Sequence, residues 1–191
     1  MKSLLCAGSV AALAALGIAC GGNPTSATQN GNFRVMLTDT PFSDAKALLV
    51  TFSDVAVHAS GGEWTTVPFS GGGSSRTCDL KQLQNNAQDV LGIGTIPAGH
   101  YTQVRVTVTR AALYFDAAAQ APACAPSIAA PSGRAVTLNI PSGQIILNHE
   151  FDVIATNSGT MVLDFKADQS IVQTGNGTYQ ISPVIAVVSF Q

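Results

Sequence analysis

The sequence predicts an all-β fold, a single antiparallel β-sandwich preceded by a signal peptide and a flexible linker. Roughly nine short segments show the alternating polar and apolar pattern of half-buried strands, and turn-forming residues separate them. The most regular segment, residues 101–109, places valines on one face and polar side chains on the other. Helical spacing occurs in one candidate segment after the leader, residues 79–91.

Residues 1–19 are typical of a secretion signal. Lys2 supplies the positive start, and the apolar run from Leu4 to Ile18 is too short and too rich in Gly and Ala for a transmembrane helix. The run ends Leu-Gly-Ile-Ala-Cys, which resembles a bacterial lipobox, the motif whose cysteine is acylated and becomes the mature N-terminus. This implies that Cys20 binds membrane lipid and that the protein is secreted across the inner membrane to the outer membrane or cell surface. The alternative is ordinary signal cleavage nearby, with Cys20 as a free thiol.

Residues 20–31 are small and polar, which predicts a flexible tether before a domain at residues 32–191. The first strand is expected at Phe33–Leu37. Residues 47–58 are expected to form one long strand. The apolar residues that share its core face lie at even-numbered positions before Ser53-Asp54 and at odd-numbered positions after it, which indicates a β-bulge. A glycine turn then leads into residues 64–67.

The candidate helix at residues 79–91 begins at Asp79, a suitable cap. Asn85 and Asn86 interrupt it, so we expect a turn or two at most. The central element is the turn and strand at residues 96–108, in which Pro97 presets the turn. Tyr101 is placed to lay its ring on the core edge and to bond backbone with its hydroxyl.

The second half of the chain begins with an Ala/Pro-rich surface loop at residues 117–132. Strands are then expected at residues 136–140, 145–153, 161–165, 170–174, 178–181 and 184–190. Asn176-Gly177 is a strong hairpin signal between two of them.

Four cysteines have three different fates in this interpretation. Cys6 leaves with the leader and Cys20 carries lipid. Cys78 and Cys124 remain, and in an oxidising compartment they are the natural disulfide pair, joining two loops. No Cys-x-x-Cys or nearby histidine accompanies either one, so the pattern does not favour zinc.

Charge argues against nucleic acid as a partner. Only 10% of residues are charged and the net charge is −2. Neither a polybasic run nor a basic stripe interleaved with aromatics is present, as nucleic-acid binding would require.

Catalytic groups are not evident in the sequence. The three histidines, His58, His100 and His149, lack the Gly-x-Ser-x-Gly turn that positions a nucleophile. His149 lies on the side of its strand that is expected to face the core, and His100 lies in a turn, so a structural role is favoured for both. The sequence predicts no catalytic residue and no cofactor.

Two side-chain groups suggest ligands but have simpler explanations. Asp39, Asp44 and Asp54, with Asp164 and Asp168, could gather around Ca²⁺, yet no calcium-binding loop motif appears, so solvated turn residues are favoured and no metal is predicted. Aromatic side chains could stack on sugars, although core and edge packing is favoured; they are Trp64, Tyr101, Tyr114 and Tyr179.

Several segments, in this order, resemble a known series. They are Leu37-Thr38-Asp39-Thr40-Pro41, Val50–His58, Trp64, Asp79-Leu80, Ile96–Arg105, Leu163-Asp164-Phe165, Ser170-Ile171-Val172 and Ile181–Ile185. The series is similar to the bacterial and archaeal family called domain of unknown function 4382, and the similarity covers residues 32–188. The resemblance implies a lipoprotein or secreted protein. Its Pro-Ala-Gly-x-Tyr turn is similar to transthyretin-like and carboxypeptidase-regulatory-like sandwiches, and the fold expected is a transthyretin-like or Ig-like sandwich. It supplies no catalytic residues.

Two hypotheses follow. The first is a non-enzymatic, membrane-anchored module of the cell envelope that binds a glycan or protein or has a structural role, with a binding face at Tyr101, Gln103 and Arg105. The second is a hydrolase of envelope polymers with an unrecognised active site. A deep cleft that places histidine beside Asp or Ser would favour the hydrolase.

Overall fold

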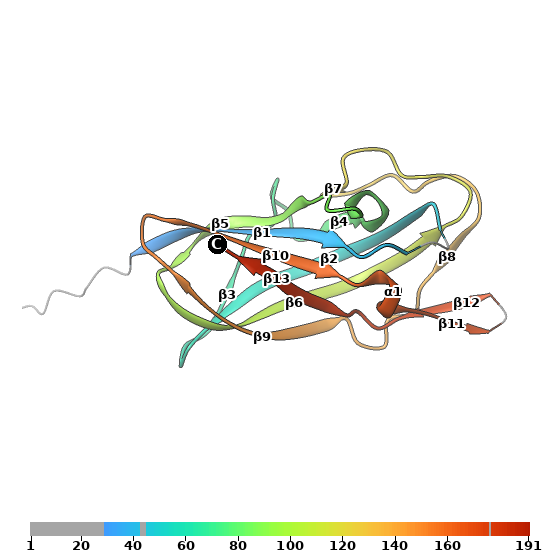
Figure 1. Ribbon diagram of the computed structural model, residues 1–191. Helices are drawn as coiled ribbons and strands as arrows, with labels where there is room; N and C mark the ends of the chain where they lie inside the picture. Colours follow the sequence, from blue (N-terminus) through green and yellow to red (C-terminus); the bar gives the residue numbers. More distant parts are fainter. Residues whose placement is uncertain (1–28, 43–44, 176) are drawn as a thin grey trace, which may run out of the picture.

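The computed structural model describes residues 29–42, 45–175 and 177–191, and this part of the chain is the predicted β-sandwich (Figure 1). One sheet has four strands in the order β13 (Ile185–Phe190), β10 (Ser158–Phe165), β1 (Asn30–Asp39) and β5 (Asp89–Pro97). The other sheet has the order β7 (Cys124–Ala125), β4 (Arg76–Asp79), β2 (Ala47–Ala59), β6 (Gly99–Tyr114) and β8 (Ala135–Thr137). In addition, β3 (Trp64–Thr66) pairs with β2, and β9 (Gln144–Val153) pairs with β6.

The predicted lipid site Cys20 lies outside the described residues, as do Cys6 and Asp44.

The four-stranded sheet contains the one parallel pair among the named strands. β1 and β10 run side by side in the same direction, with Arg34 opposite Thr160 and Thr38 opposite Asp164 (Figure 1). The remaining strand pairs are antiparallel, as predicted. β1 begins at Asn30, inside the segment expected to be linker.

The core lies between the two sheets. Phe52 of β2 meets Phe165 of β10 edge to face, with ring centroids 6.3 Å apart, and both side chains are fully buried. The register of β2 against β6 shifts between Phe52 and Asp54, which confirms the predicted bulge. The bulge allows Val55 and Val57 to point into the core although their parity differs from that of Phe52.

The predicted helix is a short turn, as the two asparagines indicated. A 3₁₀ helix, η1, spans Leu80–Leu83, and the Asp79 carboxylate accepts a hydrogen bond from the backbone N–H of Lys81 at 3.2 Å. Asn85 and Asn86 have φ values of 58° and 67°, a conformation that cannot continue a right-handed helix. Near the C-terminus, β11 (Ile171–Gly175) and β12 (Thr178–Ile181) form the hairpin expected around Asn176-Gly177.

Tyr101 bonds to backbone as the sequence predicted. Its hydroxyl donates to the carbonyl of Pro97 at 2.7 Å, and its ring stacks on Phe151 of β9 with centroids 5.3 Å apart. Phe151 also contacts Phe33 of β1 and Phe190 of β13, with centroid separations of 5.6 and 5.0 Å. Tyr101 therefore joins the turn before β6 to an aromatic cluster drawn from both sheets.

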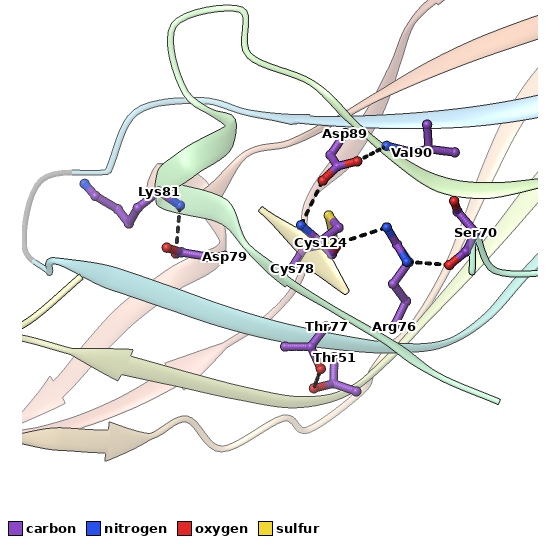
Figure 2. The surroundings of a disulfide bond; sticks show 10 residues. All are labelled: Thr51, Ser70, Arg76, Thr77, Cys78, Asp79, Lys81, Asp89, Val90 and Cys124. Carbon is purple, nitrogen blue, oxygen red and sulfur yellow. Dashed lines mark hydrogen bonds between the residues drawn. A yellow bond between two sulfur atoms is a disulfide. The ribbon is translucent and has the colours of Figure 1, made fainter. Parts of the chain in front are cut away.

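The Cys78–Cys124 disulfide is present, but it joins two short strands rather than two loops (Figure 2). Arg76 donates to the carbonyl of Cys124 at 2.9 Å, and the N–H of Cys124 donates to the Asp89 carboxylate at 2.9 Å. Since Arg76 belongs to β4 and Asp89 begins β5, these bonds connect the Ala/Pro-rich segment to both sheets. The strand β7 has only two residues, which is too short for a periodic signal in the sequence.

Replacing both cysteines, as Cys78→Ser with Cys124→Ser, should lower the free energy of unfolding by about 2–4 kcal/mol, because the unfolded chain loses a crosslink between distant residues. Urea denaturation of the two proteins measures the difference. The oxidised wild-type protein should also lose stability on reduction, and a change below about 1 kcal/mol would contradict the expected role.

Tyr101→Phe should cost about 1 kcal/mol, because it removes the bond to Pro97 while the ring keeps its contact with Phe151. Tyr114→Phe is the matched control, since the Tyr114 hydroxyl makes no side-chain hydrogen bond within the described residues. Equal denaturation midpoints for the two variants would show that the Tyr101 hydroxyl contributes nothing.

Candidate functional site

The predicted binding face on β6 needs one correction, because Tyr101 points into the core and is only 1% exposed. The register of β6 against β9 shifts between Tyr101 and Gln103. This irregularity places Tyr101 and Val104 on the same buried side, where simple alternation had put Tyr101 outside. Tyr101 is therefore removed from the predicted face.

Gln103 and Arg105 do lie on the outward side of the seven-stranded sheet, but neighbouring side chains already engage them. Gln103 donates to the Asn148 side chain at 2.8 Å. Arg105 donates to the Asp54 carboxylate at 2.8 Å, and its guanidinium lies 4.5 Å from the centre of the Trp64 ring. A ligand at this face would have to displace these contacts.

The histidines are dispersed over the described residues. His58 contacts the Trp64 ring, and His149 stacks near Phe151. His100 bonds to Asp152 at 2.8 Å, and both side chains are exposed. No hydrogen bond joins any of the three to a serine or cysteine side chain in the part of the chain that the structure describes.

The aspartates are only partly brought together. Asp54 pairs with Arg105, and Asp168 is exposed on α1 (Ala167–Ser170). Within residues 29–42, 45–175 and 177–191, no three Asp, Glu, His or Cys side chains are grouped so that they could hold a metal ion. Asp39 and Asp164, which the sequence placed in separate regions, do meet at one end of the sandwich.

They meet because of the register of the four-stranded sheet, whose outward face consists of four cross-strand rows. The first row is Thr95, Asn32 and Ser158, and the second is Ile93, Arg34 and Thr160. The third, Val90, Met36 and Val162, is apolar, and the fourth pairs Thr38 with Asp164. Polar hollows therefore lie at the two ends of this face, with an apolar row between them.

The hollow over the first two rows has a volume of about 590 Å³, and we call it the Arg34 hollow. Its lining side chains include Asn32, Arg34, Ile93, Thr95, Ser158 and Thr160. No carboxylate contributes to this lining. It therefore combines one cation with neutral groups that form hydrogen bonds.

The second hollow, of about 330 Å³, lies where β1 ends, and we call it the Asp164 hollow. Thr40 donates to the Asp164 carboxylate at 3.0 Å, and the Lys166 ammonium lies 4.0 Å from it. The Thr38 hydroxyl bonds to the carbonyl of Ala87 at 2.9 Å, which holds the loop after η1 against the strand end. The asparagine side chains of this loop complete the lining.

Asp39 is buried below the Asp164 hollow and is only 4% exposed. Its carboxylate accepts hydrogen bonds from the Gln84 side chain at 3.1 Å and from the backbone N–H of Ala167 at 3.2 Å. Burial raises the pKa of Asp39 to about 7, although these two bonds act in the opposite direction. Asp39, which is among the residues that line this hollow, therefore links the end of β1 to the residue after η1 and to the start of α1 through both of its oxygens.

These residues define a class of protein: an all-β sandwich domain with polar hollows on one exposed sheet face. The chain belongs to the family described as a domain of unknown function (DUF4382), whose model matches residues 30–183, and the predicted family is thereby confirmed. No curated protein and no solved structure matches the chain, so the likeness to transthyretin-type sandwiches stays a prediction. Among the described residues, no helix is long and apolar enough to cross a membrane.

The raised pKa of Asp39 predicts that stability changes with pH. The folded protein holds the proton on Asp39 more tightly than the unfolded chain does, because the pKa of this carboxyl is 3.8 in the unfolded chain and about 7 in the folded protein. The free energy of unfolding should therefore fall as the pH rises from about 4 to 7. The total fall should be a few kcal/mol. Asp39→Asn, which keeps a neutral side chain at all pH values, should flatten this part of the profile.

Urea denaturation at several pH values measures this effect. Asp168→Asn serves as the control, since Asp168 is exposed and should leave the profile as in the wild type. If the free energy of unfolding of Asp39→Asn changes with pH as steeply as that of the wild type, another group is responsible for the pH dependence.

Proposed function

We propose that this protein is a lipid-anchored lipoprotein of the bacterial cell envelope, and that its β-sandwich is a non-enzymatic module that binds an envelope glycan or protein. The proposal combines the lipobox-like sequence at Cys20 with the exposed polar face of the four-stranded sheet. Acyl chains on Cys20 would hold the protein at the membrane, since each buried methylene contributes about 0.8 kcal/mol.

The observation that carries the proposal is the direction of β1. The strand begins at Asn30, shortly after Cys20 in the chain, and ends at Asp39. Its 10 residues span about 30 Å at the usual rise of a strand. If acylation holds Cys20 at the membrane, the Arg34 hollow, at the start of β1, is closer to the anchor along the chain than the Asp164 hollow, at the end of β1.

Two further features support this function. The disulfide between Cys78 and Cys124 is typical of proteins that fold in an oxidising compartment outside the cytoplasm. The described histidines do not join a nucleophile, and the Asp39 carboxylate is enclosed by its own hydrogen bonds. A binding role fits these side chains better than acid–base or nucleophilic catalysis.

Radiolabelled palmitate distinguishes acylation from ordinary signal cleavage. We expect label in the wild-type protein and none in Cys20→Ala. Cys6→Ala is the matched control, because it removes a leader cysteine and should leave labelling intact. Label that persists in Cys20→Ala would overturn the anchor.

A further inference from the structure

Within the part of the chain that the structure describes, Arg34 is a cation without a counter-ion. Ion pairs in the described residues join His100 to Asp152, Arg105 to Asp54 and Lys166 to Asp164, and none includes Arg34. Arg34 is exposed on β1, one of the two inner strands of the four-stranded sheet. A guanidinium presents donors in a planar fork that suits two oxygens of one carboxylate.

The rest of the Arg34 hollow is rich in groups that both donate and accept hydrogen bonds. Hydroxyls of Thr95, Ser158 and Thr160 surround Arg34 on the two neighbouring strands, and Asn32 adds an amide. Each hydroxyl of a sugar also donates and accepts hydrogen bonds, so these side chains can bond to it either as donors or as acceptors. The Ile93 side chain, 41% exposed, offers an apolar contact for ring C–H groups.

We propose that the Arg34 hollow binds a carboxylate-bearing sugar residue of an acidic polysaccharide. Arg34 holds the carboxylate, and the four neutral polar side chains bond to the ring hydroxyls. The proposal rests on the proposed function as a binding module and names its ligand class. It is independent of the lipid anchor.

An extended peptide fits this face less well. Peptides that join sheets bond to the free backbone of an edge strand. β1 is paired with β5 on one side and β10 on the other, so its backbone groups are already used. Side-chain hydroxyls alone would leave much of a peptide backbone unpaired.

A lipid surface also fits poorly. A basic side chain near an anionic membrane contributes about 1 kcal/mol. Arg34 is the only basic residue among the side chains that line the hollow, so it could not hold the sheet face flat against a bilayer. A discrete acidic sugar needs only one such charge, supplemented by neutral hydrogen bonds.

The test uses the purified mature chain, residues 20–191, carrying Cys20→Ala, so that neither the apolar leader nor acyl chains can bind the probes. Calorimetric titration with oligomers of galacturonate, alginate and hyaluronate should show binding to at least one. Arg34→Gln should weaken that binding about tenfold or more, because a charge-assisted hydrogen bond is lost. Arg110→Gln, the same change at an exposed site on the other sheet, should bind as the parent does.

The remaining arms identify the ligand chemistry. The methyl ester of the bound oligomer should lose affinity to a similar degree, and polyglutamate and phosphatidylglycerol vesicles should not bind. Four results would each overturn the proposal. They are equal affinity for the ester and the acid, binding of polyglutamate as tight as that of the oligosaccharide, binding of vesicles that depends on Arg34, and no binding of any of the three oligosaccharides. Thermal melts of both arginine variants should match the parent, which shows that the substitutions leave the fold intact. If the sugar-binding proposal fails, the proposed anchoring through Cys20 is unaffected.

Discussion

The parallel pairing of β1 with β10 is the constraint on which the arrangement of the polar groups depends. It brings together strands that lie near opposite ends of the chain, and its register decides which side chains share a row. A shift by one residue would turn Arg34 and Thr38 inward and expose Phe33 and Leu37, which are now buried. The hydrophobic core therefore fixes the outward face as well. The same burial that stabilises the sandwich also holds a cation at one end of this face and a carboxylate at the other.

The two ends of the sandwich are held in different ways. At the end where β1 begins, an aromatic cluster around Phe151 joins the sheets through ring contacts. Where β1 ends, polar bonds predominate: Asp39 joins three elements, and Cys124 is tied to β4 by the disulfide and to β5 through Asp89. Apolar packing is largely insensitive to pH and redox state, whereas a buried carboxyl responds to pH and a disulfide responds to redox state. The end bearing the Asp164 hollow is therefore the more sensitive to its surroundings.

The sequence predicted most elements of the fold, because alternation and turn residues are local signals. The bulge in β2, the short turn after Asp79 and the hydroxyl bond of Tyr101 all follow from neighbouring residues. What could not be predicted depends on pairing between distant strands. Asp164 lies beside β1 only because of the parallel register, and Arg34 has no special sequence context until β5 and β10 place hydroxyl groups around it. Tyr101 was misplaced for a related reason, since an irregularity in β6 breaks the alternation on which its predicted exposure relied.

The outer strand β13 has a consequence for the behaviour of many copies together. Its residues, Ile185 to Phe190, carry no charge, Val188 is 54% exposed, and β10 is its one named partner among the described strands. A free, uncharged edge is a template on which another chain can add a strand. The register shift opposite Val162 and Leu163 interrupts the regular spacing of the backbone there. An interrupted ladder is a poorer template than a regular one, so this irregularity should disfavour the addition of a strand from a neighbouring molecule, above all where copies are crowded together.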